Sequence, residues 1–150
     1  MEVINELMPT DPVRIEAMQE KGPTGPIVMV NLLKFRDHAS YPADHPDAKA
    51  GLSGREAYAR YATAVIELLP KFGGRALWAG DVRFLALGQV EDLWDEVALA
   101  EYPDRAALWS MSTSPEWQAI SVHRAAGLAG QLNIETTPLA GFGTTAASEG

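Results

Sequence analysis

Residues 93–128 constrain the fold more than any other segment, because a strand and two separate helix starts follow one another there. In residues 94–102, Val97 and Leu99 alternate with smaller or charged residues, and this period of two predicts a strand. We expect Val97 and Leu99 to face the helices. The carboxylate of Asp104 can then cap the helix that follows, because its oxygens accept hydrogen bonds from free backbone amides.

A second helix is predicted to begin at Ser114. Its hydroxyl can cap the helix, Pro115 suits the first turn, and Glu116 complements the positive end of the helix dipole. Gly127 is expected to end this helix in the left-handed conformation. Residues 128–135 form the last predicted strand.

Three more elements are predicted in the first half of the chain. A Thr-Asp-Pro motif starts a short helix that ends near Glu20. The apolar, β-branched residues 27–35 predict a strand buried on both faces. Ser53 and Glu56 have the spacing of a capping box at the start of a third helix. Its apolar stripe consists of Tyr58, Tyr61, Val65, Leu68 and Phe72.

Two segments leave alternatives open. Residues 75–87 contain two strand-like pieces separated by Gly80 and Asp81, which fits either one bent strand or a tight hairpin. Residues 36–52 are predicted to form a long surface loop, in which His38 and His45 lie among aspartates. Their spacing fits no metal motif, so we expect a solvated loop and no metal site.

Composition limits the possible functions. The chain has 150 residues, of which 47% are hydrophobic, so one domain with one core is expected. Cysteine is absent, which excludes disulfides and thiol chemistry. The formal charge of −8 disfavours nucleic acid and anionic lipid as partners. The sequence shows no secretory signal and no apolar run long enough to span a membrane, so a cytoplasmic protein is expected.

The order of predicted elements points to an α+β fold. After an extra N-terminal helix, it is the split βαβ arrangement of ferredoxin-like folds, with two helices on one face of an antiparallel sheet. The other face would be bare and apolar, so we expect a homodimer whose sheets meet face to face. The expected boundaries are an N-terminal extension in 1–24, the ferredoxin-like domain in 25–136 and a flexible tail in 137–150, where Leu139 and Phe142 could dock.

Several blocks of sequence resemble a known bacterial family. They are GPIVMVNLLKFR at 25–36, SGREAYARY at 53–61, GGRALWAG at 73–80, and WDEVALAEYPDRAALWSM with SPEWQAISVHRAAGL at 94–128. These blocks are similar to domain of unknown function 1330, a member of the dimeric α/β-barrel group that also contains antibiotic-biosynthesis-type monooxygenases. The resemblance implies the fold and a dimer. It implies no agreed reaction, catalytic residue or cofactor.

Candidate site residues are the polar groups that interrupt apolar strands, together with neighbouring aromatic groups and a helix end. Each buried polar group must be hydrogen-bonded or hydrated, so such residues can line a cavity. Arg75 is a candidate carboxylate clamp, with Trp78 and Tyr58 as apolar walls. The alternative is that these polar groups pair across the sheet or at the dimer interface. The full set is Asn31, Lys34, Tyr58, Arg75, Trp78, Asp95, Glu96, His123 and Arg124.

His123 and Arg124 have a second explanation, because cations near the end of a helix complement its dipole. Two functions therefore remain open. The first is a homodimeric protein that binds a small organic molecule without a cofactor. The alternative is a cofactor-independent monooxygenase-like or isomerase-like enzyme, in which His123, Asp95 or Glu96 moves a proton.

Overall fold

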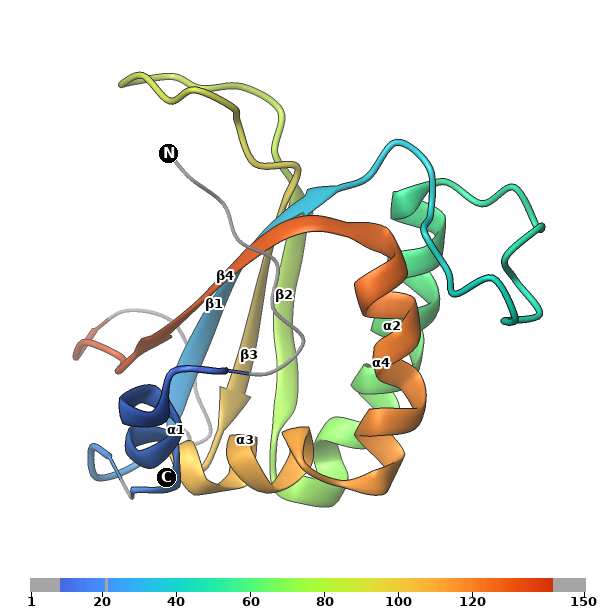
Figure 1. Cartoon of the computed structure of the whole chain (residues 1–150). Helices are drawn as coiled ribbons and strands as arrows, with labels where there is room; N and C mark the ends of the chain where they lie inside the picture. The colour runs from blue at the N-terminus through green and yellow to red at the C-terminus, as the bar shows by residue number, and fades with distance from the viewer. Residues whose placement is uncertain (1–8, 21, 142–150) are drawn as a thin grey trace.

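Strand β1 (Ile27–Phe35) lies inside a four-stranded antiparallel sheet with the order β2-β3-β1-β4 (Figure 1). The computed structural model describes residues 9–20 and 22–141. The other strands are β2 (Arg75–Asp81), β3 (Glu96–Tyr102) and β4 (Leu128–Thr136). Helices lie between β1 and β2 and between β3 and β4, which confirms the predicted ferredoxin-like order.

The helices begin where the sequence predicted. They are α1 (Pro12–Gln19), α2 (Gly54–Leu68), the 3-10 helix η1 (Leu69–Phe72), α3 (Arg105–Ser112) and α4 (Pro115–Gly127). Ser53 and Glu56 form the predicted capping box, with hydrogen bonds of 2.9 and 3.0 Å. Asp104 and Ser114 cap α3 and α4 through their side-chain oxygens.

The core lies between the helices and one face of the sheet. Ile27, Met29 and Leu33 of β1 are buried on that face, among aromatic and aliphatic residues of α2, α3 and α4. Val97 and Leu99 face the opposite way, because they pair with the even-numbered residues of β1. The expectation that these two residues face the helices was wrong. A period of two separates two faces, but it cannot say which one meets the helices when both are apolar.

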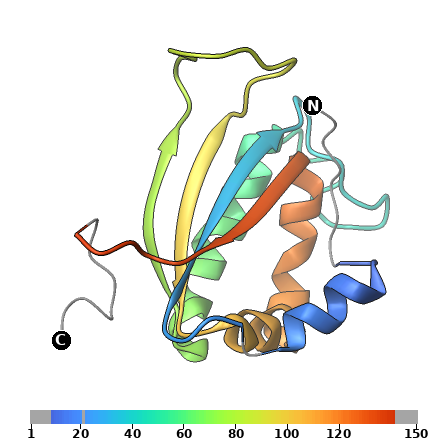
Figure 2. The same cartoon turned by 90° about the vertical axis from the view of Figure 1, so that its left-hand side faces the viewer.

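The segment 75–87 contains one strand and not two. β2 has a bulge between Ala76 and Trp78 and ends at Asp81. Residues 82–95 then form an arm, closed at its base by the 2.8 Å hydrogen bond from Val82 N to Asp95 O. The arm extends beyond the end of the sheet (Figures 1 and 2), and Phe84, Leu85 and Leu87 in it are exposed.

We expected Gly127 to end α4 in the left-handed conformation, and this expectation was wrong. It has no positive φ, and α4 leads directly into β4. A Cβ atom at Gly127 would lie 2.5 Å from the carbonyl oxygen of Gly54, and one at Gly54 would lie 2.6 Å from that of Gly127. Both residues must therefore be small because α2 and α4 approach each other at this point.

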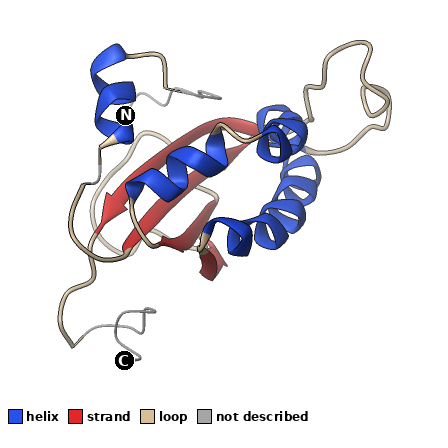
Figure 3. Cartoon of the chain, turned by 90° about the horizontal axis from the view of Figure 1, so that it is seen from below, coloured by secondary structure: helices blue, strands red, loops and turns tan. Residues whose placement is uncertain are grey.

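The loop between β1 and α2 lies on the far side of the helices from the sheet (Figure 3). Ala39 N donates to Leu52 O, and Ser40 N donates to Ala126 O, which fixes the loop against the end of α4. Leu139 is exposed and does not dock. Phe142 and the rest of the predicted tail, 142–150, lie outside the described residues. None of the described helices is both long and apolar enough to cross a membrane.

Candidate functional site

A half-open cavity of about 1070 Å³ lies between the helices and the sheet. Its floor includes four small residues of the neighbouring strands β2 and β3, namely Ala76, Ala79, Ala98 and Ala100. Its walls are largely aromatic and aliphatic, and include Met29, Tyr58, Tyr61, Tyr102, Met111 and Trp117. Small-molecule sites commonly have volumes of about 300 to 1000 Å³, so this space is large enough for an organic ligand.

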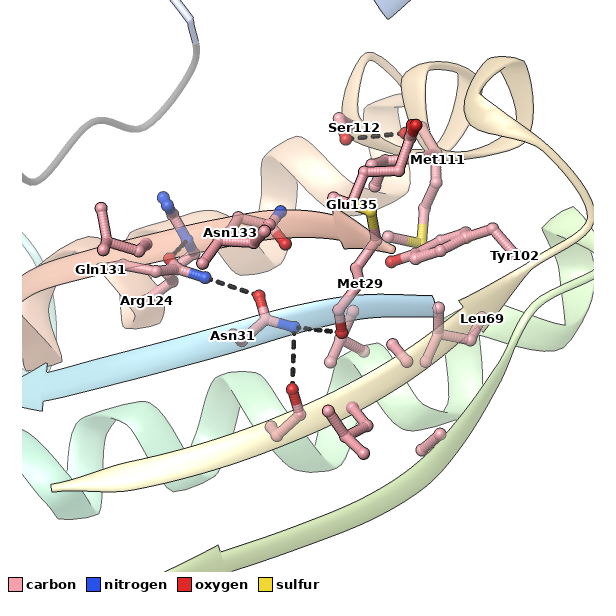
Figure 4. Close-up of a pocket in the computed structure, with 18 of the residues that line it drawn as sticks. Met29, Asn31, Leu69, Tyr102, Met111, Ser112, Arg124, Gln131, Asn133 and Glu135 are labelled. Atoms are coloured by element: carbon pink, nitrogen blue, oxygen red, sulfur yellow. Dashed lines mark hydrogen bonds between the residues drawn. The ribbon is translucent and has the colours of Figure 1, made fainter. Parts of the chain in front are cut away.

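A chain of hydrogen bonds crosses the cavity from α4 to β3 (Figure 4). Arg124 Nε donates to Gln131 Oε1 at 3.0 Å, and Gln131 Nε2 donates to Asn31 Oδ1 at 2.8 Å. Asn31 Nδ2 then donates to the backbone oxygens of Ala98, at 3.3 Å, and Met29, at 3.4 Å. These hydrogen bonds fix the orientation of the Asn31 and Gln131 side-chain amides.

Two tyrosines lie beside this chain. Trp117 Nε1 donates to the hydroxyl oxygen of Tyr61 at 3.0 Å, and the ring centroids of Tyr58 and Tyr61 are 5.4 Å apart. Burial raises the pKa of both Tyr58 and Tyr61, so both phenols are neutral at physiological pH. They can donate or accept a hydrogen bond in the cavity.

Glu96 lines the same cavity from β3. Burial raises the pKa of its half-buried carboxyl, while the charge of Arg55 opposes that shift. Glu96 and Arg124 both act on Tyr58: the carboxylate raises the pKa of the phenol and the guanidinium lowers it. This part of the cavity therefore combines a cation, a phenol and a carboxyl group.

The other end of the cavity contains an ion pair. Arg105 Nε and Nη2 donate to the two carboxylate oxygens of Glu135 at 2.7 and 2.8 Å. This hydrogen bonding lowers the pKa of Glu135. Arg105 Nη1 also donates to Ala17 O at 3.0 Å, so it ties α1 to the same end of the cavity.

The structure brings four of the nine predicted site residues together in the cavity: Asn31, Tyr58, Glu96 and Arg124. Trp78 borders the cavity from the edge strand β2 and is 58% exposed. The remaining four residues lie elsewhere.

Lys34 and Asp95 lie at the end of the sheet, where they hold the base of the arm. Lys34 Nζ contacts Leu93 O at 2.9 Å, Asp92 Oδ1 at 2.9 Å and Asp95 Oδ1 at 3.4 Å. Asp95 Oδ2 accepts a hydrogen bond from Phe35 N at 2.8 Å. These contacts match the alternative that the polar residues pair within the sheet.

Arg75 lies on the face of the sheet that points away from the helices, because it pairs with Glu101 opposite Val28. Its Nε is 3.2 Å from Glu101 Oε1. Arg75 is not among the residues that line the cavity. Of the arginines that the sequence singled out, Arg124 is the one that reaches the cavity.

The side chain of His123 points to the other side of α4 from that of its neighbour Arg124. Its Nδ1 lies 2.7 Å from the hydroxyl of Tyr41, in the loop behind the helices. The ring of His45 stacks on Tyr41 with a centroid separation of 4.7 Å. Among residues 9–20 and 22–141, no cluster of three or more histidine or acidic side chains could hold a metal ion.

Three cavity residues were not predicted as site residues from the sequence: Gln131, Tyr61 and Trp117. Gln131 had a usable signal, since it is a polar residue inside the last predicted strand and meets the criterion that selected Asn31. Tyr61 and Trp117 had none beyond their apolar stripes, because helical periodicity does not distinguish a core residue from a cavity wall.

Comparisons with known proteins give a family and a fold. The family model described as domain of unknown function 1330 matches residues 48–135. No curated protein matches the chain. The crystal structure of a protein of unknown function from Rhodopseudomonas palustris has a TM-score of 0.76 and 29% identity, and the match covers 91% of this chain and 98% of that one.

Two more solved structures are similar. The methylated form of the same protein gives a TM-score of 0.77 and 29% identity over 91% of this chain and 97% of its own. A dimeric protein of unknown function with a ferredoxin-like fold, from Bacteroides fragilis, is 17% identical over 74% of this chain and 94% of its own, with a TM-score of 0.48. The family model covers more than half of the 150 residues, and the chain therefore belongs to the family of domain of unknown function 1330.

Proposed function

We propose that this protein is a homodimer that binds a small organic molecule in the cavity between its sheet and its helices. The observation that carries the proposal is the cavity of about 1070 Å³, whose walls are apolar and whose polar groups are held in place by the Arg124, Gln131 and Asn31 chain. This combination of apolar walls with a few oriented polar groups is typical of ligand sites.

The side chains that β2 and β3 present to the helices support a role of this space in binding a ligand. Protein interiors are close-packed, and side chains that meet helices are commonly large. Here β2 and β3 present alanines to the helices, at Ala76, Ala79, Ala98 and Ala100, whereas Val97 and Leu99 of β3 point the other way. The space between the helices and the sheet therefore results from the small side chains at these four positions.

The opposite face of the sheet supports the homodimer. Val30 and Leu32 of β1 pair on this face with Leu99 and Val97 of β3. Ile134 of β4 is 45% exposed on the same face. A contiguous apolar face on a single sheet is typical of a protein surface that a partner covers, and in a closed symmetric pair that partner is a second copy.

The cavity is tested with a variant that fills it. Ala98→Phe adds a ring at the cavity floor, and Ala59→Phe adds the same ring on the exposed side of α2. Binding of a library of small organic fragments is measured by ligand-observed NMR. We expect the wild type and Ala59→Phe to bind the same fragments and Ala98→Phe to lose them. Equal binding by all three proteins would place the ligands outside the cavity and reject the proposal.

Glu96 favours a second candidate function, proton transfer in an isomerase-like or monooxygenase-like enzyme. Of the three proton carriers that the sequence singled out, Glu96 is the one in the cavity, and its raised pKa brings it closer to neutral pH. In ²H₂O, a bound fragment with an acidic C–H should exchange that hydrogen with the wild type. The variant Glu96→Gln should bind the fragment without exchange, and exchange at the wild-type rate would exclude Glu96.

A further inference from the structure

We propose that the natural ligand of the cavity is an anion with a flat apolar body, of the class of aromatic carboxylates, and that Arg124 binds its acid group. This inference rests on the proposed binding function and adds the chemistry of the ligand. Three features of the cavity support it: the charge of Arg124, the rigidity of its support, and the shape of the walls beside it.

Arg124 places a permanent positive charge inside an apolar cavity. The residue lies in the last turn of α4 and its guanidinium carbon is 6.0 Å from the ring centroid of Trp117. Burial lowers the pKa of Arg124, yet a guanidinium remains protonated at any physiological pH. Charges interact more strongly in such an environment than in water, so the guanidinium of Arg124 attracts an anionic group and repels a cationic one.

The support of Arg124 is built before any ligand arrives. Its Nε donates to Gln131 Oε1, and Gln131 is held in turn by Asn31, whose amide reaches the backbone of β3. Along this series of hydrogen bonds, each side chain donates to the next one, from the guanidinium to the sheet. A guanidinium held this way loses little freedom on binding, and its charge favours a carboxylate as the ligand group.

The walls next to Arg124 are flat. Tyr61 and Trp117 meet at an interplanar angle of 89°, with ring centroids 6.3 Å apart, and form a right-angled corner. Tyr58 extends this surface. Flat rings interact favourably with aromatic edges and faces, so a planar body fits this corner better than a sugar or a polar chain does.

Arg105, another arginine that lines the cavity, lies at the other end. Arg105 already has both oxygens of Glu135 as partners at 2.7 and 2.8 Å and also holds Ala17. A ligand carboxylate at that end would have to compete with an existing bidentate pair. The structure therefore assigns the acid group of the ligand to the Arg124 end.

The test compares two probes of nearly equal shape, 2-naphthoate and the neutral 2-naphthamide. Their affinities for the dimer are measured by isothermal titration calorimetry with the wild type, with Arg124→Gln, and with Arg83→Gln as a control in the exposed arm. A charge-assisted hydrogen bond contributes enough for a preference of at least about ten-fold. We expect the wild type and Arg83→Gln to prefer the acid by this factor, and Arg124→Gln to bind both probes with affinities within about two-fold.

The outcomes separate this inference from the proposed function. If the wild type binds acid and amide equally, the cavity binds ligands but the anionic class is wrong. If Arg124→Gln keeps the preference, another group binds the acid and the assignment of Arg124 is wrong. If the wild type binds neither probe nor any fragment, the proposed function fails as well. Arg124→Lys retains the positive charge but not the planar guanidinium, so we expect its preference for the acid over the amide to lie between those of the wild type and Arg124→Gln. This variant provides the same test if Arg124→Gln does not fold.

Discussion

The hydroxyl of Tyr41 lies 2.7 Å from Nδ1 of His123 and connects the loop between β1 and α2 to helix α4. His45 stacks on Tyr41, and Asp47 in the same loop forms a 2.6 Å ion pair with Arg60 of α2. The loop that looked solvated in sequence is therefore anchored on two helices. The direction of the hydrogen bond between Tyr41 and His123 depends on the protonation of His123: an unprotonated Nδ1 accepts from the Tyr41 hydroxyl, whereas a protonated Nδ1 donates to its oxygen.

This contact predicts a pH dependence of stability. Burial lowers the pKa of His123; the charges of His45 and Arg60 lower it further, and the charge of Asp47 opposes them. The folded state thus favours the neutral ring, so unfolding takes up a proton below the unfolded pKa of about 6.5. The stabilisation is fully present above that pH and is lost as the pH falls toward the lower folded pKa.

Urea unfolding at pH 7.5 and pH 5.5 measures this effect. We expect the wild type to lose more stability between the two pH values than His123→Asn does. The control His38→Asn alters an exposed histidine of the same loop and should retain the wild-type pH dependence. A pH dependence that is unchanged in His123→Asn would assign the titration to another group.

The contact between Gly54 and Gly127 predicts that alanine at either position lowers the stability of the protein, whereas alanine in place of glycine commonly raises the stability of a helix. Replacing glycine by alanine within a helix commonly stabilises it by up to about 1 kcal/mol. Here a methyl group at Gly127 would meet Gly54 O at 2.5 Å, and one at Gly54 would meet the backbone oxygens of Arg36 and Gly127. Gly54→Ala and Gly127→Ala should therefore each destabilise the protein by about 1 to 3 kcal/mol. Chemical denaturation measures both changes, and an increase in stability for either variant would show that the helices can move apart.

The apolar face of the sheet predicts the effect of a charge on assembly. Leu99→Lys places an ammonium group in the middle of the proposed interface, where its burial would be costly. We expect multi-angle light scattering to give twice the 16.2 kDa chain mass for the wild type and a single chain mass for the variant. Thr63→Lys, on an exposed helix position, should remain dimeric. A dimeric Leu99→Lys would place the interface on another surface.

The hydrogen-bond chain in the cavity predicts a difference between two asparagines. Asn31 and Asn133 are register partners on adjacent strands, but Asn31 accepts from Gln131 and donates to the backbone, whereas Asn133 is exposed. Asn31→Ala leaves the Gln131 amide without its acceptor and should cost about 1 to 3 kcal/mol of unfolding free energy. Asn133→Ala should change it by less than about 0.5 kcal/mol. Similar losses for both variants would contradict a role for the chain in stability.

Local signals predicted most of the fold. The helix starts at Ser53, Asp104 and Ser114 were readable because a cap acts on amides only two or three residues away. The order of elements then left few topologies, and the ferredoxin-like sheet was the one found. Residues 82–87 were misleading because an apolar, strand-like composition also occurs in an exposed arm.

The composition of the candidate site depended on contacts between distant segments, which the sequence of one segment does not reveal. The sequence by itself determined where helices and strands begin, that one sheet face would be bare, and that Asn31, Tyr58, Glu96 and Arg124 were candidates. Only the tertiary structure decided that these four share a cavity, that Arg75 points away from it, and that His123 and Arg124 serve opposite sides of α4. The physical reason is that strand register and helix rotation determine which side chains meet. Both are set by packing between segments far apart in the sequence, such as those of Asn31 and Gln131, which are 100 residues apart.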